Sequence, residues 1–489
     1  MENKIRLLPG IPDDDNRDYL PEKLKESEIV VNENGNNSQV YPKKLKEMKA
    51  CLMDDNTDTW YEYVPDSYDP TKKTPLVFAM HGGIMTGWAQ CVYTSWSLVA
   101  DREGFIVVYP NAHSRRFWQI ECERRLFDIL SAPNEEGIYM HDFPDDYREN
   151  NDARIVLKLI EIMKEKYNID EERIYMQGMS LGNAMTLLMA RHFGNHFAAM
   201  AGSAGPSTIG LLFDENDNPK NDAGPLTTWQ ARMEFDQSPP GSNDTVEDVV
   251  AKNREYWLRI NECDELPQIK LDGENNFAFY HGKKADYVFR DVKNRDHGQT
   301  FDEAEFVWDY LFSGSKRKTD GTIEYLEPNL KREGDKVSFA VAGDCEYAWV
   351  NNKKVKMPAK SVMWQKLKYH GLQGGAKVRG EYCMIPASFV AQVMNASYEE
   401  KDGWAAMVLQ DGRTLQIARG CIGCTINNRV RSMLCEPIER NGRLYISVEW
   451  FFRDIHNWHV STLRDVMYAT DHYSLLSVNM ARLIKDLLV

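Results

Sequence analysis

The sequence predicts an α/β protein whose mostly parallel sheet has helices on both faces, followed by a smaller α+β domain. Short continuous apolar runs occur at residues 75–80, 104–109 and 173–176. Amphipathic helical periodicity lies between them, most clearly over residues 153–167. Apolar strands that alternate with such helices are typical of βαβ units around a parallel sheet. Beyond about residue 321 this pattern gives way to short strands with a weak internal repeat.

These patterns divide the chain into four segments. Residues 1–45 are polar and predict an N-terminal arm, whereas residues 46–315 carry the βαβ pattern of the main domain. A polar, Gly-containing stretch at 313–321 predicts a linker over 316–335. In residues 336–489, the segment 350–355 resembles 426–431, and 380–389 resembles 441–450. Each copy predicts a strand with a tight turn, and then a strand that runs into a short helix.

Composition excludes several classes of protein. The 489 residues are 43% hydrophobic and 27% charged, with a net charge of −15, which disfavours nucleic acid as a partner. No apolar run approaches the ~18 residues that a membrane-spanning helix needs. The first residues lack the pattern of a secretion signal, so we expect a cytoplasmic protein. A chain whose leader had been removed would look the same, which leaves an extracellular location open.

Metal and cofactor sites are not predicted. The nine cysteines are spread thinly and are odd in number, unlike a secreted disulfide framework. Cys421 and Cys424 form a CxxC, but no second pair completes a zinc site at a familiar spacing. His456 and His459 lack a third ligand. We therefore expect no metal and no cofactor.

The sharpest motif is Gly-Met-Ser-Leu-Gly at residues 178–182, between the apolar run 173–176 and an apolar helical segment. A Gly-x-Ser-x-Gly turn from strand to helix holds the serine in a strained conformation and exposes its hydroxyl at the carboxyl edge of the sheet. The flanking glycines remove Cβ atoms that would clash. The motif predicts Ser180 as a nucleophile.

A serine nucleophile needs a base and an orienting acid, which follow it in that fold in the order acid, then histidine. His297 lies in a loop just before the last helix of the main domain, and we expect it to be the base, with His281 as the alternative. Glu234 follows a predicted strand and is the favoured acid. Asp236, two residues on, is its alternative.

An oxyanion formed at the ester carbonyl needs backbone donors that are already in place. One should be the amide of Leu181, the residue after the nucleophile. The other should come from the loop after the early strand, where His81-Gly-Gly83 permits close backbone approach. We select Gly83, with Ile84 as the near alternative.

With these motifs in view, residues from about 60 to 314 resemble the polyhydroxybutyrate depolymerase and feruloyl esterase group of α/β hydrolases. The resemblance rests on the segments 63–65, 75–83, 108–111, 167–170, 173–182 and 257–261. The group commonly has His-Gly-x-x-Asp before the acid, where this chain has Gln-Ala-Arg-Met-Glu at 230–234. A cysteine usual beside Trp118 is Phe117 here, which implies that the group's disulfide to the Cys263 region is absent.

Residues from about 336 to 480 resemble the two-repeat domain found at the N-terminus of some copper amine oxidases and as a stalk module in bacterial envelope proteins. No copper chemistry follows from this resemblance. We hypothesise that this domain packs beside the mouth of the site or mediates formation of a homodimer.

The resemblance implies a bacterial serine esterase that acts on a small-molecule or oligosaccharide ester through an acyl-enzyme. It also places Trp118 in the acyl pocket. Trp88, Met179 and Trp229 lie near the motifs, and if they face the pocket, the natural substrate is a feruloyl or other hydroxycinnamoyl ester. Acetylated carbohydrates and a polyhydroxyalkanoate-type polyester are alternative substrates. A non-catalytic protein that binds glycans or the envelope is the alternative from another class.

Overall fold

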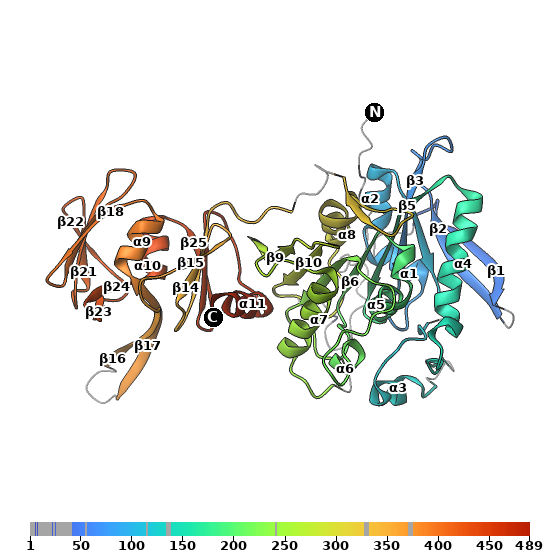
Figure 1. Ribbon diagram of the computed structural model, residues 1–489, viewed down its shortest axis with the longest axis horizontal. Helices are drawn as coiled ribbons and strands as arrows, with labels where there is room; N and C mark the ends of the chain where they lie inside the picture. The colour runs from blue at the N-terminus through green and yellow to red at the C-terminus, as the bar shows by residue number, and fades with distance from the viewer. Residues whose placement is uncertain are drawn as a thin grey trace. The chain divides into compact units, whose positions relative to one another are not determined.

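The computed structural model describes Ile5, Leu7, Glu22, Lys25 and residues 42–53, 56–113, 116–133, 138–239, 242–326, 332–369 and 375–489. The chain forms two compact units (Figure 1). The first unit comprises Met1–Glu265 and Phe279–Arg332, and the second comprises Leu266–Ala278 and Glu333–Val489. Almost all of the expected N-terminal arm lies outside the described residues.

A ten-stranded sheet contains most strands of the first unit, and its last strand, β8, together with most of β9, comes from the segment Leu266–Ala278. Its order is β1-β2-β4-β3-β5-β6-β7-β10-β9-β8. The pairs β3–β4, β3–β5, β5–β6, β6–β7 and β7–β10 are parallel, and β1–β2 and β2–β4 are antiparallel. The strands are β1 Lys46–Met53, β2 Asn56–Tyr63, β3 Thr74–Met80, β4 Ile106–Pro110, β5 Ile169–Met179, β6 Ala199–Ser203, β7 Thr227–Met233, β8 Gln268–Asp272, β9 Asn275–Tyr280 and β10 Tyr287–Val292.

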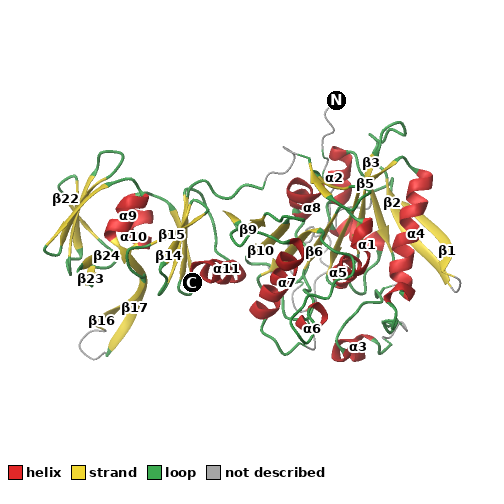
Figure 2. Ribbon diagram, in the orientation of Figure 1, coloured by secondary structure: helices red, strands yellow, loops and turns green. Residues whose placement is uncertain are grey.

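Helices connect these strands and cover the sheet. Every residue of β3, β4 and β6 is buried, which indicates cover on both faces of these strands, and the predicted mostly parallel sheet is confirmed. Figure 2 shows the helices of this unit beside its strands. They are α1 Gly87–Tyr93, α2 Trp96–Glu103, α3 Arg124–Leu130, η3 Tyr147–Glu149, α4 Asn151–Lys166, α5 Leu181–Phe193, η4 Gly194–His196, α6 Ile209–Leu212, α7 Val246–Asn261, α8 Glu303–Val307 and η5 Trp308–Phe312.

Helix α4 illustrates how the sequence specifies these elements. The side chain of Asn150 caps the helix by accepting a hydrogen bond from the amide of Ala153. Apolar side chains at helical spacing, among them Ile155, Leu159 and Met163, are buried, while the intervening Lys and Glu residues are more exposed. The periodicity at 153–167 therefore predicted this helix correctly.

The predicted linker at 316–335 differs from the structure. Strand β11 (Ser315–Arg317) pairs with β12 (Ile323–Tyr325) in an antiparallel hairpin that belongs to the first unit. The division between the units falls between Arg332 and Glu333. The polar composition of this stretch reflects a hairpin with partly exposed strands rather than an unstructured connection.

The second unit consists mainly of antiparallel sheets. Their orders are β15-β14-β13-β26-β25, β16-β17-β24-β23 and β18-β19-β20-β21-β22. The strands are β13 Ser338–Ala342, β14 Tyr347–Val350, β15 Lys353–Lys356, β16 Val362–Tyr369, β17 Ala376–Pro386, β18 Ser397–Lys401, β19 Trp404–Val408, β20 Thr414–Ala418, β21 Gly423–Ile426, β22 Arg429–Ser432, β23 Ile438–Arg440, β24 Arg443–Ser447, β25 His459–Leu463 and β26 Val466–Thr470. The helices are α9 Ala387–Val393, α10 Val448–Trp450, η6 Phe451–Ile455 and α11 Val478–Leu488.

The two sequence copies form equivalent structures in this unit. Asn351 and Asn352 join β14 to β15, and Asn427 and Asn428 join β21 to β22, all with positive φ. Paired left-handed residues define the two-residue hairpin turn for which asparagine is well suited. In both copies a later strand runs directly into a short helix, β17 into α9 and β24 into α10. The two segments that the sequence pairs therefore share an Asn-Asn hairpin turn and a strand-to-helix junction.

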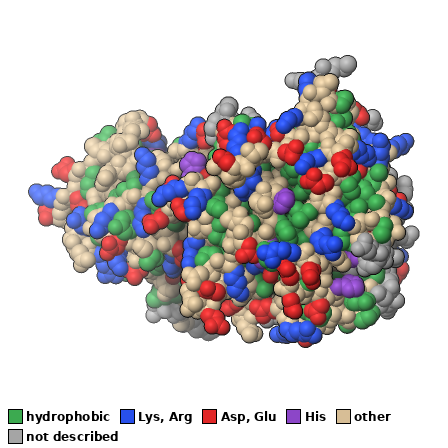
Figure 3. Space-filling model, turned by 45° about the vertical axis from the view of Figure 1, so that its right-hand side comes forward, with side chains coloured by type: hydrophobic (Ala, Val, Ile, Leu, Met, Phe, Trp, Pro, Cys, Tyr) green, Lys and Arg blue, Asp and Glu red, His purple; other side chains and the backbone are tan. Residues whose placement is uncertain are grey.

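The described surface carries charges of both signs. On the face drawn in Figure 3, Lys and Arg side chains are interspersed with Asp and Glu side chains. Within the described ranges, no helix is both long and apolar enough to cross a membrane. The same ranges contain no group of three or more His, Cys, Asp or Glu residues arranged to hold a metal ion. All nine cysteines are free thiols.

Candidate active site

Ser180 occupies the sharp turn between β5 and α5. Its φ of 56° and ψ of −121° are strained for a residue with a side chain. A Cβ on Gly178 would lie 2.1 Å from the carbonyl oxygen of Gly182, and a Cβ on Gly182 would lie 2.4 Å from that of Met80. Only glycine fits at both positions, which is the physical basis of the Gly-x-Ser-x-Gly motif.

The side chains of Ser180, His297 and Asp236 form one hydrogen-bonded chain. The Nε2 atom of His297 lies 2.7 Å from Oγ of Ser180, and its Nδ1 atom lies 2.7 Å from Oδ1 of Asp236. Asp236 is buried, and Arg232 donates to its Oδ2 atom at 2.6 Å. The His297 side chain is about half exposed, at 49%. The histidine therefore bridges a buried carboxylate to a hydroxyl that substrate can approach.

The structure corrects the expectation that Glu234 orients His297. Glu234 instead contacts Nζ of Lys293 at 3.1 Å and accepts from the amide of Asn294 at 2.8 Å. After β7 ends, the amide of Asp236 donates to the carbonyl of Met233, and this turn directs Asp236 toward the histidine. Sequence spacing alone did not reveal this turn. The carboxylate that contacts His297 is that of Asp236, the alternative acid.

Two backbone amides near Ser180 are suited to bind an oxyanion. Leu181 is the first residue of α5, where amides have no partner within the helix. Gly83 lies beside it, and a Cβ on Gly83 would lie 2.6 Å from Cδ1 of Leu181. Among the described residues no hydrogen bond involves the Gly83 amide, whereas the amide of Ile84 donates to the carbonyl of Arg116. The geometry favours Gly83 over the alternative, Ile84.

A buried histidine and a tryptophan support the loop that carries Gly83. The Nε2 atom of His81 accepts from the amide of Ala112 at 3.1 Å, so Nδ1 bears the proton and donates to the carbonyl of Gly82 at 2.7 Å. Burial lowers the pKa of His81 to about 4, which keeps the ring neutral. The indole of Trp118 donates to the carbonyl of His81 at 2.7 Å. These contacts fix the backbone that precedes Gly83.

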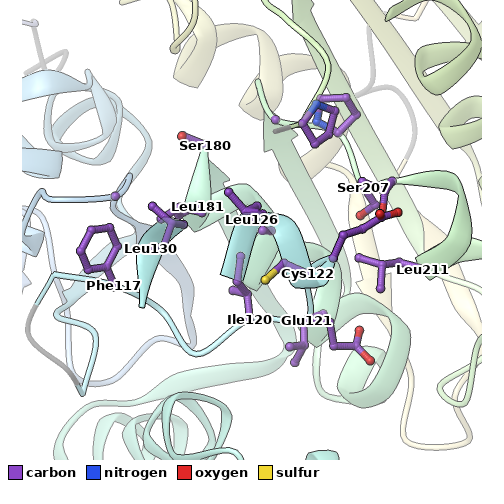
Figure 4. Close-up of a pocket in the computed structure, with 18 of the residues that line it drawn as sticks. Phe117, Ile120, Glu121, Cys122, Leu126, Leu130, Ser180, Leu181, Ser207 and Leu211 are labelled. Atoms are coloured by element: carbon purple, nitrogen blue, oxygen red, sulfur yellow. The ribbon is translucent and has the colours of Figure 1, made fainter. Parts of the chain in front are cut away.

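A largely apolar pocket of about 320 Å³ opens beside Ser180 and His297. Figure 4 shows Ser180 and Leu181 in its upper part and Ile120 and Glu121 in its lower part, with Leu126 and Cys122 between them. The apolar residues that line it are Gly83, Ile84, Phe117, Ile120, Leu126, Leu130, Leu181, Ala184, Leu188, Gly205, Pro206, Leu211 and Pro239. The remaining lining residues, apart from Ser180 and His297, are Glu121, Cys122, Glu123, Arg191, Ser207 and Thr208.

None of the four side chains expected to contact substrate is among the described lining residues of this pocket. Trp118 turns its indole N–H to the His81 loop, and Trp229 donates to the buried carboxylate of Glu303 at 3.2 Å. Met179 is buried beneath Gly82. Trp88 is 43% exposed on α1. Both buried indoles satisfy their N–H groups inside the protein, which is the usual condition for burying a tryptophan.

Sequence reasoning missed the polar residues of the pocket. Arg191 lies on α5 three residues after Leu188, so the helical spacing from Leu181 places it on the same face. Glu121 pairs with Arg191, and Thr208 lies just before α6. The spacing of Arg191 was readable in the sequence. The partners Glu121 and Thr208 come from distant loops that carried no recognisable pattern.

A mostly parallel sheet with a strained serine between strand and helix, hydrogen-bonded to a histidine and a buried aspartate, defines the α/β-hydrolase class. Within that class, residues 60–215 match the family model described as esterase PHB depolymerase. This match covers less than half of the chain.

Three curated relatives are informative. The bifunctional acetylxylan esterase/xylanase of Neocallimastix patriciarum is 30% identical over 30% of this chain and 18% of that protein. Acetylxylan esterase A of Emericella nidulans is 27% identical over 30% of this chain and 41% of that protein. Poly(3-hydroxyalkanoate) depolymerase C of Paucimonas lemoignei is 24% identical over 38% and 46%. The chain thus spans less than half the length of each. Together with the family match, these similarities support a carboxylic ester hydrolase.

Proposed function

We propose that this protein is a serine carboxylic-ester hydrolase that acts through an acyl-enzyme. The observation that carries the proposal is the continuous hydrogen-bonded chain from Ser180 through His297 to Asp236. The order of these residues in the sequence is the order expected of an α/β hydrolase. The family match and the esterases among the relatives support the same reaction.

Each group has a defined task in this mechanism. Oγ of Ser180 attacks the ester carbonyl carbon while its proton passes to Nε2 of His297. The amides of Leu181 and Gly83 donate to the oxyanion. When the tetrahedral intermediate collapses, the C–O bond to the alcohol breaks and the alcohol leaves with the proton from His297. Water then repeats the sequence on the acyl-enzyme, which releases the acid and restores Ser180.

Asp236 acts through the histidine. Its carboxylate holds Nδ1–H of His297, which leaves Nε2 free to accept the serine proton, and it stabilises the imidazolium that forms. Arg232 is itself buried and donates from Nη2 to the carbonyls of Asp236 and Gln237 at 2.6 and 2.8 Å. The carboxylate is therefore held both by a charge partner and through its own backbone.

The pocket favours an ester whose acyl group is long and apolar. An acetyl group would leave most of the apolar wall formed by Phe117, Ile120, Leu126 and Leu130 unused. A hydroxycinnamoyl group would cover it, so we propose that feruloyl-type esters are the substrates. Hydroxyalkanoate polyesters and acetylated carbohydrates remain the competing substrates, and relatives of both kinds support testing them.

Substitution of Ser180 tests the proposed reaction. Ser180→Ala should lower kcat for p-nitrophenyl acetate by about 10⁶-fold, and a fluorophosphonate should label the natural protein, but not the variant, at residue 180. Ser67→Ala is the matched control, because Ser67 is exposed and precedes the opposite end of β3. Turnover retained by Ser180→Ala would remove Ser180 from the mechanism. A panel of hydroxycinnamate, acetylxylan and polyester substrates ranked by kcat/KM would then separate the substrate classes.

We also propose that residues 336–489 form a module of the kind found at the N-terminus of copper amine oxidases, and that this module mediates dimerisation. The equivalent Asn-Asn turns and strand-to-helix junctions of its two copies support this proposal. Deletion of residues 330–489 without any change in oligomeric mass would contradict this role.

A further inference from the structure

One end of the acyl pocket carries buried polar groups that the ester hydrolysis described above does not use. Helix α5 begins directly after Ser180, and its residues Leu181, Ala184, Leu188 and Arg191 all line the pocket. At about 1.5 Å per residue, the helix rises roughly 15 Å from Leu181 to Arg191. One helix face therefore leads from the reacting serine to a buried guanidinium.

Arg191 is 4% exposed and is held from two directions. It forms an ion pair with Glu121, and its Nη1 atom donates to the carbonyl of Leu211 at 2.5 Å. Among the described residues, however, its Nε atom has no hydrogen-bond partner. A buried guanidinium N–H without an acceptor is costly, and an acceptor that arrives in the pocket would remove this cost.

A second buried group points to the same ligand. Thr208 is also 4% exposed, and its Oγ1 atom has no hydrogen-bond partner within the described part of the chain. Thr208 occupies the N-cap position of α6, where a threonine hydroxyl commonly accepts from the helix backbone, yet here it makes no such bond. Its hydroxyl is therefore available to a molecule in the pocket that it lines.

The charges of this region select the chemistry of the ligand. Among the described lining residues, the carboxylates of Glu121 and Glu123 outnumber the guanidinium of Arg191, so a carboxylate at the end of the acyl group would be repelled. A neutral hydroxyl fits because it accepts from an N–H of Arg191 and also donates, whether to a carboxylate or to Thr208.

We infer that Glu121, Arg191 and Thr208 form a subsite that binds a hydroxyl group at the far end of the substrate's acyl group. This inference rests on the proposed ester hydrolysis at Ser180. A rigid 4-hydroxycinnamoyl group extends roughly 8 Å from its carbonyl carbon to its phenol oxygen, summed from bonds of about 1.4 Å. Because side chains on an α-helix lean toward its start, we expect the guanidinium to lie closer to Ser180 than the roughly 15 Å helix rise, on the side from which that oxygen arrives. An acetyl group ends far short of it.

The experiment compares methyl 4-hydroxycinnamate with methyl cinnamate, which differ by one hydroxyl. The full-length protein should prefer the hydroxylated ester in kcat/KM, and Thr208→Val should reduce that preference by about 3- to 10-fold, the loss of one neutral hydrogen bond. Thr208→Ser, which keeps the hydroxyl, should retain the preference. Because the Thr208 hydroxyl has no described partner, Thr208→Val should fold with an undiminished melting temperature.

Binding of both esters to Ser180→Ala, measured by calorimetry, separates this inference from the proposed reaction. If Ser180 is not the nucleophile, Ser180→Ala will still hydrolyse both esters, and the subsite is then tested by the difference between their KM values, which Thr208→Val in that background should reduce. Equal binding and equal turnover of the two esters would overturn the inference. A preference that Thr208→Val leaves unchanged would overturn it as well.

Discussion

Replacing Asp236 with asparagine tests the corrected identity of the acid. Asp236→Asn keeps the size of the side chain but removes the charge that lies 2.7 Å from Nδ1 of His297. An asparagine that donates its N–H to Nδ1 would put the ring proton on Nε2, the atom that must accept from Ser180 at 2.7 Å. The same substitution in a serine triad costs about 10⁴-fold in kcat, and we expect a loss of about 10³- to 10⁴-fold here.

Glu234→Gln is the matched control, because it makes the same chemical change two residues away. Glu234 contacts Lys293 and Asn294 and makes no described contact with His297, so kcat should fall less than 10-fold, the effect of one polar contact in the loop. The assay is kcat for p-nitrophenyl acetate at pH 8, with circular dichroism to show that both variants fold. A loss in Glu234→Gln equal to that in Asp236→Asn would refute the assignment of Asp236.

Two further predictions concern the loop that carries the oxyanion donors. Gly83→Ala places a Cβ 2.6 Å from Cδ1 of Leu181, so it should displace an amide that we propose as a donor and lower kcat by about 10²-fold. Gly375→Ala, whose Cβ would have no described atom within 4 Å, serves as the control. Burial lowers the pKa of His81 from 6.5 to about 4, so the unfolded chain gains a proton first as the pH falls. The free energy of unfolding should therefore be highest above pH 6.5 and should fall by roughly 3 kcal/mol as the pH is lowered to 4. Urea unfolding at each pH measures this change. The decline should be smaller in His81→Gln. An equal decline in this variant would show that His81 does not cause the loss of stability at low pH.

The sequence was sufficient to predict those elements whose structure depends only on their own residues. Strands β3 and β4 are buried on both faces, so their continuous apolar composition was enough to predict them as strands. The nucleophile turn was equally readable, because Gly178 and Gly182 exclude any other residue by direct contact with backbone oxygens. The paired asparagines of the second unit also predicted hairpin turns, because asparagine tolerates positive φ.

What the sequence did not reveal depended on contacts between distant segments. The choice between Glu234 and Asp236 follows from a turn whose direction is visible only once His297 is in place. Trp118 was expected in the pocket by resemblance and Trp229 because it lies near the motifs, yet both indoles face internal acceptors instead. Proximity in sequence gives no information about which side of a strand or loop an indole will occupy.

The strain at Ser180 and the placement of the oxyanion donors have a common physical origin. The close approach of Gly182 to the carbonyl of Met80 brings the end of β3 against the start of α5, and this contact sets Gly83 beside Leu181. The positive φ of Ser180 costs on the order of 1–3 kcal/mol, and the hydrogen bond that its amide donates to the carbonyl of Ser203 at 3.0 Å helps to hold that conformation. The packing that forces the serine into a strained turn thus also places the two amides that we propose as donors side by side, so under this proposal stabilisation of the oxyanion requires no rearrangement during the reaction.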